Sequence, residues 1–237
     1  MKGHLNAGFL RAVVAVGVFA VFVIGLVVVP RRVRAHDEDE DEDQAKVRIG
    51  IQIAPVKLNL KGKDRDLVGL GSYIVNAQGD CDGCHSRTTE FAAPGIPFFG
   101  QHPTKVNPDG YLAGGQDFGA LDSQGLSFHI IVRNLTPDKT GRTEGGATFD
   151  EFLQRIRHGT DLDKFHPTCT DGLNPTCVPP PFDGSVLQIM PWPIYANMTR
   201  HDLRAIYEYL SAIPCVEGDP GNPKGSDTGN ERCEHND

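Results

Sequence analysis

The chain has 237 residues, of which 39% are hydrophobic and 8% aromatic, enough to build the core of one modest domain. Its 27 glycines and 17 prolines predict long irregular loops and few regular elements. Residues 1–35 carry five basic residues and no acid, whereas the rest carries 18 basic and 31 acidic residues, a net charge of −13. A nucleic-acid surface needs a basic patch, so this balance excludes that class of partner.

The N-terminal segment is strongly apolar. Ala12–Val29 contains no polar side chain, and as a helix its length would be about 27 Å, enough to cross a bilayer core. A secretory signal has a shorter apolar stretch, although Val33-Arg34-Ala35 could serve as its cleavage site. Residues 1–35 are therefore predicted to be a transmembrane anchor, and a cleaved signal is the alternative. Basic residues flank the span on both sides and do not set its orientation.

Residues 36–62 are predicted to form an acidic spacer and an extended arm. The acidic run Asp37–Asp43 repels itself, which favours an extended, solvated segment. A metal-binding or partner-binding tract is the alternative. Residues 47–60 then alternate apolar and other side chains with the period of a strand, interrupted by Pro55. A proline there favours an edge strand or an arm lying on the folded domain, which is predicted to cover residues 63–237.

Three later segments have the pattern of amphipathic helices: Asp66–Ala77, Phe149–His158 and Thr199–Ile213. Gly159 is expected to end the second helix as its C-terminal cap. In the third helix Thr199 is the expected N-cap, with Asp202 in place of the usual capping-box glutamate. No strongly alternating strand pairs occur between residues 86 and 198, so the domain is predicted to be mostly helix and loop.

The most informative motif is Cys81-Asp82-Gly83-Cys84-His85. Two thiols at this spacing, followed by a histidine, are typical of covalent c-type haem attachment, in which the imidazole binds the iron. A thioredoxin-like redox pair is one alternative, but it needs a βαβ context and no histidine. Half of a zinc site is another. The remaining cysteines, which form no second close pair, are Cys169, Cys177, Cys215 and Cys233.

A second axial iron ligand is sought among three methionines, Met1, Met190 and Met198. Met190 precedes Pro191, which stiffens the loop, and a thioether ligand raises the potential of a haem iron. Met198 directly precedes the predicted N-cap and fits a role in the core. Met190 is therefore the predicted ligand. A histidine, above all His166, and an open distal position are the alternatives.

Several further motifs accompany this pair of ligands. They are Gly71-Ser72-Tyr73-Ile74-Val75, Gly114-Gly115, Asn134-Leu135-Thr136-Pro137-Asp138, Arg157-His158-Gly159, Met190-Pro191-Trp192 and Ala205-Ile206-Tyr207. With them the chain resembles, from about residue 69 to residue 214, the monohaem bacterial class I cytochromes c. The resemblance is greatest to the cytochrome c modules of membrane-bound alcohol and gluconate dehydrogenases.

The resemblance implies a class I cytochrome c-like helical domain around one covalent haem c. It implies Cys81 and Cys84 as the thioether attachments, His85 as the proximal ligand and Met190 as the distal ligand. It also implies that the helix before the CxxCH motif crosses the helix after Thr199. Gly71 would provide the close contact of that crossing, with Tyr207 as the packed aromatic residue.

The chain departs from those modules in two ways. Its CxxCH motif occurs once, whereas the dehydrogenase subunits carry three modules, so a multihaem electron path within this sequence is not expected. A proline-rich insertion, residues 160–187, lies directly before Met190. Four cysteines remain, two in the insertion and two in the tail (residues 215–237), and they allow three pairings. Local closure favours Cys169–Cys177 and Cys215–Cys233.

These features predict a single-electron carrier rather than an enzyme, with redox proteins of the cell envelope as partners and no small-molecule substrate. Since c-type haems are attached outside the cytoplasmic membrane, the domain is expected in the periplasm, anchored to the bacterial inner membrane. It could be a free shuttle or a subunit of a dehydrogenase. Trp192 and Asn134 are candidate contacts to the haem edge. The alternative is a haem enzyme or sensor with a displaceable distal ligand, which Met190 ligation disfavours.

Overall fold

A computed structural model of the chain describes residues 34–86, 110–118, 129–164, 166–170, 177–217 and 233. The chain divides into two compact units, residues 1–42 and 43–237. The predicted membrane span, Ala12–Val29, lies outside the described residues and stays a prediction. Among the helices that are described, none is both long and apolar enough to cross a membrane.

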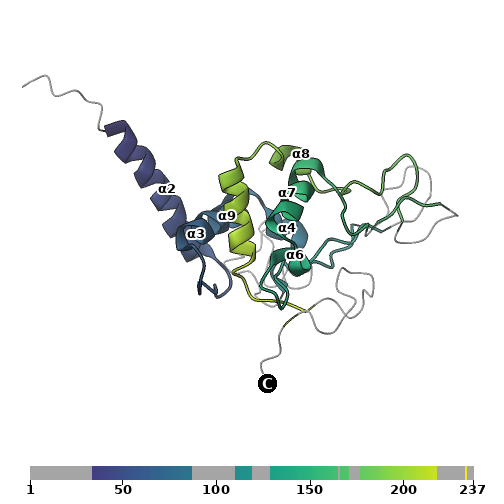
Figure 1. Cartoon of the computed structure of the whole chain (residues 1–237), viewed down its shortest axis with the longest axis horizontal. Coiled ribbons are helices and arrows are strands. Elements are labelled where there is room, and N and C mark those ends of the chain that lie inside the picture. Colours follow the sequence, from purple (N-terminus) through teal and green to yellow (C-terminus); the bar gives the residue numbers. More distant parts are fainter. Residues whose placement is uncertain are drawn as a thin grey trace, which may run out of the picture. The chain divides into compact units, whose positions relative to one another are not determined.

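The described residues are mostly helix and loop, as predicted (Figure 1). In chain order the helices are α2 (Arg34–Ile53), α3 (Arg65–Tyr73), the π-helix η1 (Ile74–Gln78), α4 (Cys81–His85), α6 (Thr143–Gly146), α7 (Phe149–His158), α8 (Trp192–Tyr195) and α9 (Arg200–Leu210). Extended pairing in the described part is limited to isolated bridges, which join Asp117 to Ile131, Thr160 to Val186 and Thr168 to Val178.

Helix α2 corrects the expected extended arm. The acidic run and residues 47–53 are helical, so an extended conformation is wrong for both. The alternating pattern misled because Val47 is buried while Ile49 is 38% exposed, which places alternate residues on different helix faces. Gly50 lies against the backbone of Gly69 in α3, where a Cβ on Gly50 would overlap the Gly69 carbonyl oxygen. Ser72 also donates a hydrogen bond to the Gly50 carbonyl oxygen at 2.6 Å.

The predicted crossing of α3 and α9 is confirmed. These two helices pack closely, and a Cβ on Gly71 would overlap the carbonyl oxygen of Ala205. The aromatic residue at this contact is Tyr209, whose Cβ lies beside Gly71. Tyr207 was the expected partner, and this detail is wrong because residues two apart on a helix face different neighbours.

Tyr207 instead joins α9 to α7. Its ring lies edge-on to Phe149 and Phe152, at centroid distances of 5.3 and 5.7 Å. Its hydroxyl donates to the carbonyl oxygen of Ala147 at 2.9 Å. The three rings therefore fix the position of α7 beside α9.

Helix α7 has the predicted bounds, and its ends follow from local sequence. Thr148 and Glu151 form a reciprocal capping box, and Gly159 ends the helix with φ 65°, a conformation that favours glycine. Helix α9 begins as predicted after Thr199, whose hydroxyl accepts the backbone N–H of Asp202 at 3.1 Å. It ends at Leu210, three residues earlier than predicted.

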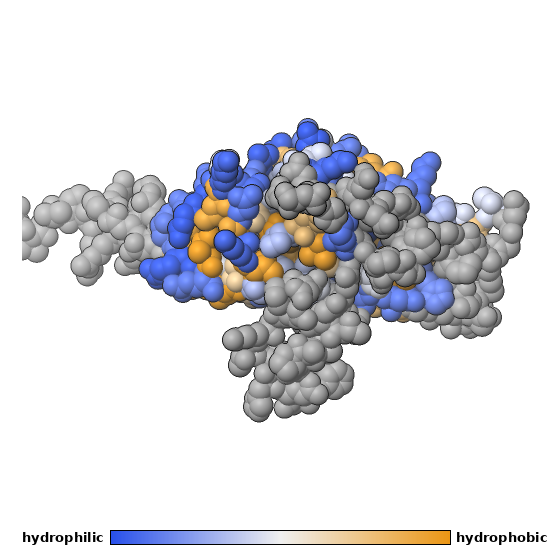
Figure 2. All heavy atoms as spheres, turned by 90° about the horizontal axis from the view of Figure 1, so that it is seen from below, coloured by the Kyte–Doolittle hydropathy of each residue, from blue (hydrophilic) through white to orange (hydrophobic). Residues whose placement is uncertain are grey.

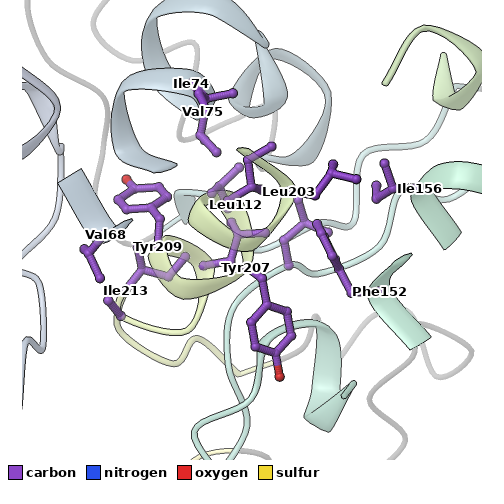
Figure 3. Close-up of a cluster of buried hydrophobic side chains, with 14 of the residues drawn as sticks. Val68, Ile74, Val75, Leu112, Phe152, Ile156, Leu203, Tyr207, Tyr209 and Ile213 are labelled. Carbon is purple, nitrogen blue, oxygen red and sulfur yellow. The ribbon is translucent and has the colours of Figure 1, made fainter. Parts of the chain in front are cut away.

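The hydrophobic core lies where α3, η1, α7 and α9 meet. Figure 3 shows side chains from these elements, together with Leu112 from a loop and Ile213 from the residues after α9, gathered around α9. Burying one such aliphatic or aromatic side chain contributes about 1.5–3 kcal/mol. The labelled members are Val68, Ile74, Val75, Leu112, Phe152, Ile156, Leu203, Tyr207, Tyr209 and Ile213.

Both predicted disulfides are confirmed. Cys169 bonds to Cys177, and Cys215 bonds to Cys233. The two ends of the insertion also pair with each other, since Thr160 and Val186 form an antiparallel bridge. The Leu187 N–H donates to the carbonyl oxygen of Gly159 at 2.6 Å, so the insertion leaves and rejoins the domain at the C-terminal end of α7.

Candidate functional site

Helix α4 presents the two thiols of the CxxCH motif. The chain enters it through Asp80, which has φ 48° and is separated from the π-helix by Gly79 alone. Cys81 and Cys84 are three residues apart on one helical turn and therefore point to the same side. Both are free thiols and partly exposed. Two thiols on one face are the arrangement that covalent attachment to one edge of a porphyrin requires.

A cavity of about 350 Å³ lies beside α4, within the range of about 300–1,000 Å³ of cofactor sites. All four predicted site residues, Cys81, Cys84, His85 and Met190, line it. Much of its wall is apolar. Figure 2 shows one face of the molecule, on which hydrophobic side chains gather beside hydrophilic ones. The apolar lining includes Ile74, Phe152, Ile156, Leu203, Ile206 and Leu210.

The imidazole of His85 is oriented by the backbone. Its Nδ1 lies 2.8 Å from the carbonyl oxygen of Arg133, and because a carbonyl only accepts, Nδ1 is the nitrogen that carries the proton. Burial lowers the pKa of His85, which favours the neutral ring. The lone pair of a neutral imidazole protonated at Nδ1 is on Nε2, the form that binds a metal. The tautomer and the ring position therefore both suit a metal ligand.

Met190 lies on a short, stiff loop between the insertion and α8. Its N–H donates to Gln188 at 2.7 Å, and its carbonyl oxygen accepts the Trp192 N–H at 2.8 Å. The residue before it, Ile189, has φ 66°, an uncommon conformation for a β-branched side chain. Backbone hydrogen bonds and Pro191 together hold the thioether in the cavity wall.

The structure bears on the two other interpretations of the cysteine pair. A catalytic thiol needs a lowered pKa, but burial first, and then Asp82 and Asp80, raise the pKa of Cys81 to about 12. A zinc site would need further thiolates, and the four other cysteines are paired in disulfides. In the described part of the chain, no three His, Cys, Asp or Glu residues are placed to hold a metal ion.

The alternative ligands also border the cavity. His166 lines it, but its Nε2 lies 3.2 Å from the backbone nitrogen and 3.3 Å from the carbonyl oxygen of Ile131. Met198 lines it too, while packing on the core. The two residues expected at the haem edge, Trp192 and Asn134, are not part of the cavity wall. Trp192 covers Gly159, and Asn134 donates to the carbonyl oxygen of Val216 at 3.0 Å.

A cluster of charges forms another part of the cavity wall. Arg133 Nη1 donates to Asp163 at 2.6 Å, and Nη2 donates to Asp161. Arg155 donates to Glu144 at 2.7 Å and to Asp163 at 3.2 Å. The Nε of Arg155 is buried with no hydrogen-bond partner among the described residues, so a bound acidic group or a water would complete it.

The sequence does not reveal this cluster, because Arg133 is separated by 28 and 30 residues from the two aspartates that it binds. One signal was available: Arg155 lies between the buried positions Leu153 and Ile156 of α7. A charged residue on the apolar face of a helix predicts a buried partner.

Comparison with known proteins gives three relatives of one type. The chain is 30% identical over 145 residues to a gluconate 2-dehydrogenase cytochrome c subunit of Pantoea cypripedii. It is 28% identical over 148 residues to the cytochrome c subunits of quinone alcohol dehydrogenases from Gluconacetobacter polyoxogenes and Komagataeibacter europaeus. The predicted resemblance to these modules is confirmed.

The matches cover 61–62% of this chain but only 22% of each relative, so the chain spans about a fifth of the length of the curated relatives it matches. No protein-family profile matches the chain. No solved structure is significantly similar to it.

Proposed function

We propose that the chain is a single-electron carrier that holds one haem c covalently through Cys81 and Cys84, with His85 and Met190 as axial ligands. One observation carries the proposal: these four residues, from two distant parts of the sequence, line the same cavity. The similarity to cytochrome c subunits supports it independently.

The side chains present fit such a group. The apolar wall would exclude water from the two faces of a flat macrocycle, and α4 would hold its edge. The Arg133 carbonyl keeps Nδ1 of His85 protonated and leaves Nε2 for the metal. The bound haem would supply a one-electron iron couple, and a methionine ligand raises its potential.

We extend the proposal to location and partners. The apolar segment Ala12–Val29 would anchor the chain in the bacterial inner membrane, with residues 43–237 in the periplasm. The relatives are subunits of dehydrogenases, so a dehydrogenase subunit is a suitable electron donor. Purification of the protein from detergent-solubilised membranes tests this proposal. A dehydrogenase that co-purifies with it as a stable complex would support the subunit role. Release of the protein from membranes by high salt alone would refute the anchor.

The covalent attachment of the haem is tested by denaturing the purified protein and extracting the sample with acidified organic solvent. We expect the haem to stay with the protein, and with Cys81→Ala combined with Cys84→Ala we expect it to be extracted. Extraction from the unaltered protein would refute covalent attachment.

The distal ligand is tested with a matched pair of variants, because both methionines line the cavity. We expect Met190→Ala to abolish the weak sulfur-to-iron charge-transfer band of the oxidised protein, and Met198→Ala to keep it. Loss of the band in Met198→Ala alone would assign the ligand to Met198. Rapid carbon monoxide binding by the reduced, unaltered protein would instead support the alternative, a haem enzyme or sensor with an open distal position.

A further inference from the structure

Arg133 contacts the site in two ways at once. Its backbone carbonyl accepts the hydrogen bond from His85 Nδ1 at 2.8 Å. Its guanidinium donates to two carboxylates, to Asp163 at 2.6 Å and to Asp161. The residue that orients the predicted proximal ligand is therefore held by its own side chain.

This ion pair is well shielded from water. The side chain of Arg133 is 12% exposed and that of Asp161 only 3%, whereas Asp163 is 45% exposed. A guanidinium that spans two carboxylates is held in a defined geometry, unlike an exposed single ion pair. The contact with Asp161 is therefore the stronger constraint.

Asp161 is itself fixed by the base of the insertion. Its backbone N–H donates to the carbonyl oxygen of Ser185 at 2.9 Å, beside the bridge between Thr160 and Val186. The chain that continues from Ser185 leads through the cavity wall to Met190. The insertion thus supplies the carboxylates that hold Arg133 and also leads into the loop of the predicted distal ligand.

The backbone on both sides of Arg133 is also held by hydrogen bonds. The Leu135 N–H donates to the carbonyl oxygen of Leu112 at 2.9 Å, and the Phe118 N–H donates to that of Ile130 at 3.1 Å. Val132, the neighbour of Arg133, bonds to the strand-like segment opposite, with Val132 N–H to Gln116 O at 2.9 Å and Gly115 N–H to Val132 O at 2.8 Å. The shielded ion pair between Arg133 and Asp161 adds a side-chain restraint to these backbone hydrogen bonds.

We propose that Arg133 is a positioning residue, clamped by Asp161 and Asp163 so that its carbonyl stays bonded to His85 Nδ1 and tunes the iron. The inference rests on the proposed function. A hydrogen bond at Nδ1 makes an imidazole a stronger donor to a metal, which stabilises the oxidised form. Loosening the clamp should therefore raise the reduction potential.

The signs of two effects separate this role from simple electrostatics. Removing a positive charge near a haem favours the oxidised iron and lowers the potential. Arg133→Gln removes such a charge but also loosens the clamp, which raises the potential. Arg155→Gln is the matched control, since it removes a charge from the same cavity wall. Arg155 shares Asp163 with Arg133, but its removal leaves the buried contact of Arg133 with Asp161, the stronger constraint, in place.

Two measurements on the purified holoproteins test the proposal: the midpoint potential, and the solvent exchange of the His85 Nδ1 proton by NMR of the reduced form. We expect Arg133→Gln to raise the potential and to speed the exchange of the Nδ1 proton, because the hydrogen bond that protects this proton is loosened. We expect Arg155→Gln to lower the potential and leave the exchange unchanged. If the loss of charge and the loosened clamp cancel in the potential of Arg133→Gln, the exchange rate of the Nδ1 proton decides whether the clamp exists.

A lower potential and unchanged exchange in Arg133→Gln would overturn the clamp, while covalent haem in the same samples would leave the proposed function standing. A protein without covalent haem would refute both. If Arg133→Gln does not fold, Asp161→Asn replaces it. That variant should speed exchange, and unchanged exchange there would equally refute the clamp.

Discussion

The contact between Gly159 and Trp192 offers a sharp test of how α7 holds the Met190 loop. Gly159 ends α7 with φ 65°, and a Cβ added to it would overlap Cε2 and Nε1 of the Trp192 indole. Trp192 comes two residues after Met190. We therefore expect Gly159→Ala to destabilise the protein through two separate effects.

The two effects have known sizes. A side chain in the left-handed region costs about 1–2 kcal/mol, and overpacking against a rigid ring costs about 1–3 kcal/mol, a total of about 2–5 kcal/mol. With Trp192→Ala the ring is absent, so Gly159→Ala should then cost only the backbone strain, about 1–2 kcal/mol. The coupling energy between the two positions is therefore expected to be about 1–3 kcal/mol.

Urea unfolding followed by far-UV circular dichroism measures the cycle in four proteins: unaltered, each single variant and the double variant. Trp192 is the single tryptophan of the chain, so its fluorescence in Gly159→Ala reports directly on its displacement. Equal costs of Gly159→Ala in both backgrounds, within about 0.5 kcal/mol, would refute the packing argument.

Three further predictions follow from the caps, the helix crossing and the disulfides. Hydrogen bonds from the backbone N–H and hydroxyl of Thr148 lower the pKa of Glu151 below 4.5, so the carboxylate stabilises the fold at neutral pH and this contribution is lost as the pH falls through the lowered pKa. Glu151→Ala should cost about 0.5–1 kcal/mol at neutral pH, and a urea series in which that difference persisted in strong acid would contradict this. Gly71→Ala should destabilise the crossing of α3 and α9 by about 1–3 kcal/mol in spite of alanine's better helix propensity, and a thermal scan showing stabilisation would refute the close contact. Replacing Cys169 and Cys177 by serine opens a loop of 8 residues and should lower the free energy of unfolding by about 2.5 kcal/mol. Replacing Cys215 and Cys233 opens a loop of 18 residues and should lower it by about 3.2 kcal/mol. Denaturant titrations measure both values, and a larger loss for the shorter loop would refute the explanation by chain entropy.

Local signals allowed several elements to be predicted closely. The bounds of α7 depend on a cap at Thr148 and a glycine at 159, and the start of α9 on Thr199 and Asp202. Each of these interactions joins residues within about one helical turn, so the sequence displays both partners together. The local disulfide pairing follows the same logic, since short loops close at the lowest entropic cost.

The failures arise where distant segments compete with a local pattern. Residues 47–53 alternate as a strand would, but the glycines of α2 and α3 allow two helices to pack closely, and that contact favours the helix. The exchange of Tyr207 for Tyr209 at the α3 crossing depends on the rotation of α9, which packing against α3 and α7 sets together.

The sequence by itself predicted the chemistry that we propose for this chain. The spacing of Cys81, Cys84 and His85 predicts a haem ligand set, and Met190-Pro191 predicts a distal ligand, because these patterns reflect covalent geometry within a few residues. Only the tertiary structure decided that the four residues share one cavity, and that Arg133 bonds to His85 while Asp161 holds Arg133. Those contacts join residues 28 and 48 positions apart, and their distances depend on how the loops fold around the helices.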